Sequence, residues 1–193
     1  MADKNEKVLN EQGEEVLTIE DTCTVEEIEE SVKGFLLGDL TLAQLEGMTA
    51  ENLYAIADMG YDLLEEGKLG EAQKIFEGLN VYNPYDSYFH SALGSIYQKQ
   101  GKKEEAIKSY RAAVELYPED ITSWTNCGEL LLERSGELHK ETKVDDAVRY
   151  FEAAIECFKR ALALDPKVTT PSALRARTLV EVTAQILQSR MAS

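Results

Sequence analysis

The side chains that most often carry enzyme chemistry are few in this sequence and lie far apart. There are two histidines, His90 and His139, and neither has a serine or cysteine nucleophile motif beside it. No glycine-rich phosphate loop is present, because each glycine falls at a turn or a helix crossing of the pattern described below. The carboxylates are numerous, but solvated helix faces account for them without general acid–base catalysis. We therefore expect structural roles for both histidines, no catalytic residues and no enzyme activity.

The cysteines also lack a functional spacing. Cys23, Cys127 and Cys157 are widely separated and form neither a metal-binding nor a redox motif. Reduced thiols in a cytosol are the simplest account, and we expect no metal and no cofactor. No apolar run is long enough to span a membrane, and no apolar segment typical of a secretory signal follows Met1. The predicted location is cytoplasmic.

Acidic residues dominate the charge of the chain. Asp and Glu total 36 against 20 Lys and Arg, which gives a formal net charge of −16. Residues 1–30 hold eleven of these acids and two lysines, a net −9. An acidic surface repels phosphates and anionic lipids, so we expect no nucleic acid partner and no membrane insertion. Residues 1–23 are expected to be a solvated, disordered tail, and the alternative is a tail that screens a basic partner.

A period of 34 residues organises the middle of the chain. Five sets of residues share it: Gly60, Gly94 and Gly128; Gly67 and Gly101; Ala72 and Ala106; Phe76 and Tyr110; Pro84 and Pro118. Each unit is predicted to be two helices, with a glycine at the turn between them and a proline closing the second. The glycine and alanine inside the helices mark a crossing where two backbones approach closely. This pattern resembles the tetratricopeptide repeat, and it covers 53–166.

The third unit is longer than the others. The family spacing would place its closing proline at position 152, but the proline is Pro166, fourteen residues later. Ala147 and Phe151 are followed seven residues on by Ala154 and Phe158, which keeps an apolar stripe on one helix face. We expect one long helix over 143–164, preceded by an exposed loop over 134–142.

Helices are predicted on both sides of the repeats. Residues 24–48 should form two, because Thr24 and Glu27 have the spacing of a capping box and Thr41 opens a shorter helix that ends near Gly47. A C-terminal helix within 168–193, with Pro171 at its first position, should cover the open end of the stack. The predicted fold is all-α: a superhelix of three repeats with N-terminal helices and a C-terminal capping helix.

The first helix of each repeat is expected to line a concave groove. Twelve positions face it: Tyr54, Ala57, Tyr61, Leu64, Tyr88, Ser91, Ser95, Gln98, Thr122, Thr125, Glu129 and Leu132. They lack the Lys, Arg and Asn that would hold a C-terminal carboxylate. The predicted ligand is therefore an internal or N-terminal segment, bound extended through small apolar side chains. The alternative is that the chain's own segments cover these positions. Trp124, at the aromatic core position, is expected to pack internally rather than touch a ligand.

The first predicted helix has an apolar face that needs a partner. Five of its residues share that face: Val25, Ile28, Val32, Phe35 and Leu36. An isolated helix of this length is marginal in water, so the stripe should be buried. Its own repeat stack and the same helix of a second chain are both available.

Two segments are not dictated by the generic repeat, Thr41-Leu42-Ala43-Gln44-Leu45 and Tyr85-Asp86-Ser87. Between about 35 and 133 they occur together with Leu40, Gly67-Lys68, Phe89, Leu93 and Gly94. With them the chain resembles the class II chaperones of bacterial type III secretion. The resemblance implies a cytosolic chaperone without enzyme activity, whose groove takes an extended N-terminal segment of a hydrophobic translocator. It also implies a homodimer through the N-terminal helix. The alternative is a repeat scaffold for protein–protein interaction in another pathway.

Overall fold

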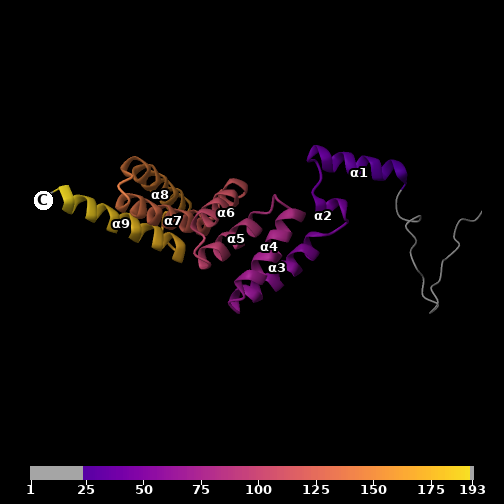
Figure 1. Ribbon diagram of the computed structural model, residues 1–193, viewed down its shortest axis with the longest axis horizontal. Helices are drawn as coiled ribbons and strands as arrows, with labels where there is room; N and C mark the ends of the chain where they lie inside the picture. Colours follow the sequence, from indigo (N-terminus) through magenta and orange to yellow (C-terminus); the bar gives the residue numbers. More distant parts are fainter. Residues whose placement is uncertain (1–23, 192–193) are drawn as a thin grey trace, which may run out of the picture. The chain divides into compact units, whose positions relative to one another are not determined.

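The computed structural model describes residues 24–191, which form helices and no strand (Figure 1). The predicted tail 1–23 lies outside the described residues. The helices are α1 (Val25–Leu37), α2 (Leu42–Leu45), α3 (Ala50–Glu65), α4 (Leu69–Tyr82), α5 (Ser87–Lys99), α6 (Lys103–Leu116), α7 (Ile121–Lys140), α8 (Val144–Leu164) and α9 (Pro171–Met191). The all-α prediction is confirmed. The chain divides into two compact units, one ending at Thr49 and one beginning at Ala50.

Two capping boxes define the helices of the first unit. The backbone N–H of Thr24 donates to the Glu27 carboxylate at 2.7 Å, and the Glu27 N–H donates to the Thr24 hydroxyl at 3.2 Å. Thr41 and Gln44 repeat this exchange at the start of α2, at 2.8 and 3.2 Å. Each box satisfies backbone donors that a helix start leaves unpaired, as the sequence predicted.

In the second unit, α3 pairs with α4 and α5 with α6 as the 34-residue period predicts. Gly67 and Gly101 form the turns with φ of 77° and 75°, a left-handed conformation that glycine adopts without strain. The crossing glycines are needed for a different reason. A Cβ atom at Gly94 would lie 2.7 Å from the ring of Tyr110, and one at Gly60 would lie 2.8 Å from the ring of Phe76. The close approach predicted for these positions is confirmed.

The third pair corrects one prediction. Residues 134–140 belong to α7, so the exposed loop predicted over 134–142 is wrong, whereas α8 over Val144–Leu164 matches the predicted long helix. α7 and α8 have 20 and 21 residues, against 13 and 14 in α5 and α6. The fourteen extra residues are therefore divided equally, one heptad to each helix. Thr142, with φ of 64°, takes the turn position that glycine holds in the earlier repeats.

The added heptads continue the helix crossing. A Cβ at Gly128 would lie 2.6 Å from the ring of Phe158, so Phe158 corresponds to Phe76 and Tyr110. One heptad beyond Gly128, Ser135 is the next small residue, and its hydroxyl donates to the Ala147 carbonyl at 2.7 Å. Ser135 and Ala147 are both buried. Because seven residues are nearly two helical turns, the buried face is retained and no loop is required.

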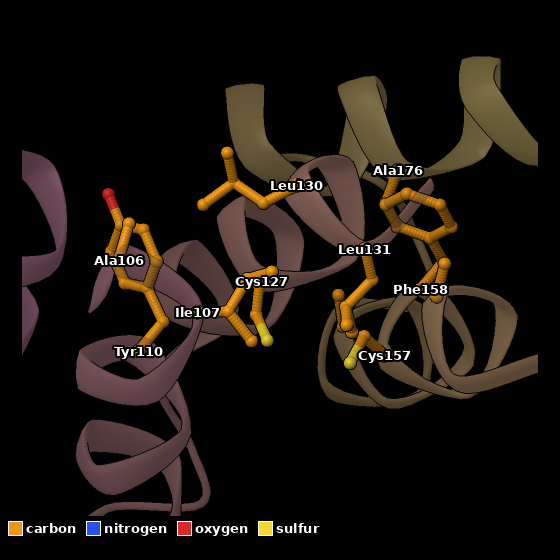
Figure 2. Close-up of a cluster of buried hydrophobic side chains, with 11 residues drawn as sticks. Ala106, Ile107, Tyr110, Cys127, Leu130, Leu131, Cys157, Phe158 and Ala176 are labelled. Atoms are coloured by element: carbon orange, nitrogen blue, oxygen red, sulfur yellow. The ribbon is translucent and has the colours of Figure 1, made fainter. Parts of the chain in front are cut away.

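A cluster of buried hydrophobic side chains joins α6, α7, α8 and α9 (Figure 2). It includes Tyr110, Leu131 and Phe158, none of which has more than 1% of its surface exposed. Ala173 and Ala176 place α9 against this cluster with no exposed surface of their own. The C-terminal helix therefore covers the last repeat, as predicted.

Candidate peptide-binding groove

Three tyrosines form the exposed aromatic end of the predicted groove. Tyr54, Tyr61 and Tyr88 have 44%, 47% and 38% of their surfaces exposed. The Tyr54 hydroxyl donates to the Asp86 carboxylate at 2.8 Å, and this hydrogen bond raises the pKa of Tyr54. Asp86 also accepts from the N–H of Tyr88 at 2.9 Å, at the start of α5. Asp86 thus holds the Tyr54 ring and caps the helix that carries Tyr88. Sequence reasoning did not identify this role, although it singled out the segment that contains Asp86.

Ring contacts hold this end in one arrangement. The centroids of Tyr54 and Tyr88 are 6.1 Å apart, and Tyr54 lies 5.8 Å from Phe89, whose ring is fully buried. Burial raises the pKa of Tyr88, so its phenol is neutral at physiological pH. The surface offered to a ligand is therefore aromatic, positioned by α3 and α5.

Three of the twelve predicted groove residues are buried, which corrects the expectation that they face a ligand. Ala57 and Thr125 have no exposed surface and Leu64 has 7%. Ala57, Ser91 and Thr125 share one repeat position, which lies between consecutive first helices. Ser91 contacts the Ser123 hydroxyl at 2.9 Å, and the Thr125 hydroxyl donates to the Ser172 carbonyl at 3.3 Å. This position therefore joins neighbouring repeats instead of lining open surface.

The second repeat contributes polar and partly buried positions. Ser91, Ser95 and Gln98 are each half-buried. The Gln98 side-chain oxygen accepts a hydrogen bond from the Tyr110 hydroxyl at 2.9 Å, which links the groove face to the helix crossing behind it. Burial raises the pKa of Tyr110 to about 12. These side chains form a neutral floor next to the tyrosines.

Helix α9 covers part of the third repeat's share of the groove. Thr122 lies 3.1 Å from the Ser172 hydroxyl, and Arg175 pairs with Glu129 at 3.6 Å and with Asn126 at 2.8 Å. Burial raises the pKa of Glu129, and Arg175 opposes that shift. The alternative that the chain covers its own groove therefore applies to this repeat. Leu132, beyond these contacts, lines an apolar groove described below.

The aromatic core position behaves as predicted. The Trp124 indole N–H donates to the Pro118 carbonyl at 2.8 Å, and the Arg160 guanidinium lies 5.9 Å from its ring. His90 occupies the same position one repeat earlier, and its Nε2 lies 2.8 Å from the Pro84 carbonyl. Both rings hydrogen-bond the proline carbonyl before their own helix, which is a structural role. His139 is exposed near the end of α7.

The apolar face of α1 is open in the described chain. Four of the predicted interface residues are exposed: Ile28 by 49%, Val32 by 42%, Phe35 by 39% and Leu36 by 76%. Ile28, Val32 and Leu36 line a shallow hollow of about 470 Å³ together with Leu37. The side chain of Val25 lies outside the described part. Pairing with a second chain stays a prediction.

Metal and membrane sites were sought over residues 24–191. No group of His, Cys, Asp and Glu there is placed to hold a metal ion. No helix in that range is both long and apolar enough to cross a bilayer. Cys127 and Cys157 are buried free thiols, and their contact with each other, together with burial, raises the pKa of Cys127. Cys23 lies outside the described residues.

This stack of paired helices defines a tetratricopeptide-repeat protein, and two models of that repeat match residues 87–120 and 147–168. A chain in a type III secretion complex from Aeromonas hydrophila is 27% identical with a TM-score of 0.67, covering 82% of this chain and 98% of that one. PcrH in complex with the chaperone binding region of PopD is 25% identical with a TM-score of 0.58, covering 72% and 96%.

A curated relative points the same way. The low calcium response locus protein H of Yersinia pestis is 31% identical over 91 residues, which are 47% of this chain and 54% of the relative. The chain thus spans about half the length of these curated relatives. These similarities confirm the resemblance to the class II chaperones of type III secretion that was drawn from the sequence.

Proposed function

We propose that the chain is a cytoplasmic, non-enzymatic chaperone that binds an extended segment of a hydrophobic translocator in the groove formed by α3 and α5. The observation that carries the proposal is the exposed tyrosine cluster of Tyr54, Tyr61 and Tyr88, in which Tyr54 is held by Asp86 and lies against Tyr88. Structures of PcrH with binding regions of PopB and PopD, and of SycD with a peptide of YopD, support it by analogy.

The chemistry of the groove suits an apolar segment. Tyrosine rings offer a large apolar area at low entropic cost, while their hydroxyls keep hydrogen bonds to water or to Asp86. The twelve predicted positions contain no Lys or Arg, and their one carboxylate, Glu129, is paired with Arg175. Binding a translocator in this way would shield apolar segments that otherwise aggregate in water. Release requires no nucleotide, because the export machinery can withdraw the segment.

Substitution of two tyrosines tests the proposal. Tyr61→Ala and Tyr88→Ala should each weaken binding of a co-expressed translocator by about 2 kcal/mol, because each removes an aromatic anchor at an interface. Affinity is measured by calorimetry on the purified proteins. Tyr117→Ala is the matched control, since Tyr117 is 49% exposed but lies after α6, away from the groove. If both groove variants bind as tightly as the control, the site lies elsewhere.

A further inference from the structure

The added heptads of the third repeat build a second apolar groove. It lies among α7, α8 and α9 and has a volume of about 520 Å³. Its apolar walls include Val144, Val148 and Phe151 of α8 and Leu179, Val182 and Ile186 of α9. Four of these side chains are 46–54% exposed, namely Val144, Val148, Val182 and Ile186. α9 therefore covers the buried core of the last repeat but leaves this outer face open.

The lining specifies the kind of segment that fits. On each helix the lining residues span seven positions along the sequence. They run from Leu132 to His139 on α7, from Val144 to Phe151 on α8 and from Leu179 to Ile186 on α9. A fourth helix with apolar residues at i, i+3, i+4 and i+7 would match these stripes, which is the helix-in-groove mode of recognition. His139 is the one ionisable residue in the lining, in a chain with 36 acids. The buried face of the occupant must therefore be aliphatic and uncharged.

The second groove shares residues with the predicted groove positions of the third repeat. Leu132 belongs both to those positions and to the second groove. A smaller hollow includes Glu129, which is one of those positions, and Leu179, which also lines the second groove. Glu129 and Arg175, the charged residues of this hollow, pair with each other at 3.6 Å. A polypeptide that follows the groove positions of the third repeat can therefore reach the second groove without meeting an unpaired charge of this hollow.

We propose that the second groove binds another segment of the same translocator, an aliphatic helix of about two turns, in addition to the segment held by the tyrosines. The proposal rests on the function proposed above. It assigns to the fourteen extra residues of the third repeat a second contact with the client, which extends the apolar length that one chaperone shields.

Charge substitutions in the full-length chain test this assignment. Val148→Asp and Val182→Asp should each weaken the complex with a co-expressed translocator at least about tenfold, because each places a carboxylate against a buried aliphatic face. Val81→Asp is the matched control, since Val81 is 65% exposed on α4. Thermal unfolding by circular dichroism checks that all three variants fold, as expected for half-exposed positions.

Photo-crosslinking from the two grooves separates the outcomes. Benzoylphenylalanine at Val148 should crosslink to an aliphatic translocator segment distinct from the one crosslinked from Tyr61. Crosslinks from Tyr61 alone, with unchanged affinity in both aspartate variants, would overturn the second groove and leave the proposed function standing. No crosslink from either position would overturn both. Crosslinks from Val148 to a second copy of the chaperone would assign the groove to self-association and also overturn the proposal.

Discussion

Gly128 gives the sharpest test of how the repeats pack. A methyl group there would lie 2.6, 2.9 and 3.1 Å from three ring atoms of Phe158. Carbon atoms pack at about 3.5–4.0 Å, so the closest overlap approaches 1 Å. Phe158 has no exposed surface, and the core around it would have to shift to make room. Overpacking of this kind costs about 1–3 kcal/mol.

The helical preference of alanine acts in the opposite direction. Replacing a mid-helix glycine with alanine gains about 1 kcal/mol where space allows. Gly128→Ala should therefore destabilise the protein by a net amount of up to about 2 kcal/mol. Gly136 is the matched control in the same helix, because a Cβ there meets nothing within 4 Å. Gly136→Ala should stabilise the protein by about 0.5–1 kcal/mol.

Urea unfolding followed by circular dichroism measures both effects as shifts of the midpoint at an unchanged slope. The double variant Gly128→Ala, Phe158→Leu should lose less stability than the two single losses combined, because the shorter leucine relieves the overlap. If Gly128→Ala and Gly136→Ala shift the midpoint in the same direction, the close crossing is not what requires glycine at 128.

Three more outcomes can be measured on the purified protein. Thr142→Gly should raise stability by about 1 kcal/mol, because a β-branched residue holds the left-handed turn conformation at φ 64°; a lower urea midpoint would contradict this. The unfolding free energy should fall as pH rises above about 10, because the Tyr110 phenol ionises there in the unfolded chain but keeps its proton up to about pH 12 in the folded protein. Tyr110→Phe should weaken this pH dependence. Sedimentation should show a dimer whose affinity rises with salt, because salt screens the acidic face of α1. The double substitution Val32→Glu, Phe35→Glu should dissociate this dimer. A monomer at every salt concentration would rule the dimer out.

Most of the fold could be predicted because it is encoded locally. The capping box at Thr24 and the glycine at 101 each act within a few residues, so their spacing in the sequence was sufficient. The course of 134–140 could not be read in this way. Gly136 and its polar neighbours are typical of a loop, yet buried Leu138 and the contact between Ser135 and Ala147 keep the segment helical. Tertiary packing outweighed the local signal.

The groove was predicted less completely than the fold, for a similar reason. Repeat position identifies which helix face a residue lies on, and it correctly placed Tyr54, Tyr61 and Tyr88 on an exposed face. It does not show what the next first helix covers. Thr125 is buried because α9 lies against it, although α9 does not belong to the three repeats from which the positions were counted. The contact joins residues 47 positions apart, beyond the reach of any local pattern.

The equal division of the insertion explains why it adds surface without disturbing the repeat. Fourteen residues placed in α8 alone would project about four turns beyond its partner, leaving an apolar stripe in water. One heptad in each antiparallel helix lets the new turns cover each other, as the contact between Ser135 and Ala147 shows. The turn at Thr142 then moves outward by the same length on both sides. What stays uncovered is the face toward the second half of α9, where Val148 and Val182 lie. The insertion therefore leaves the tyrosine end of the groove unchanged and opens an apolar surface at its far end, where a bound client would continue.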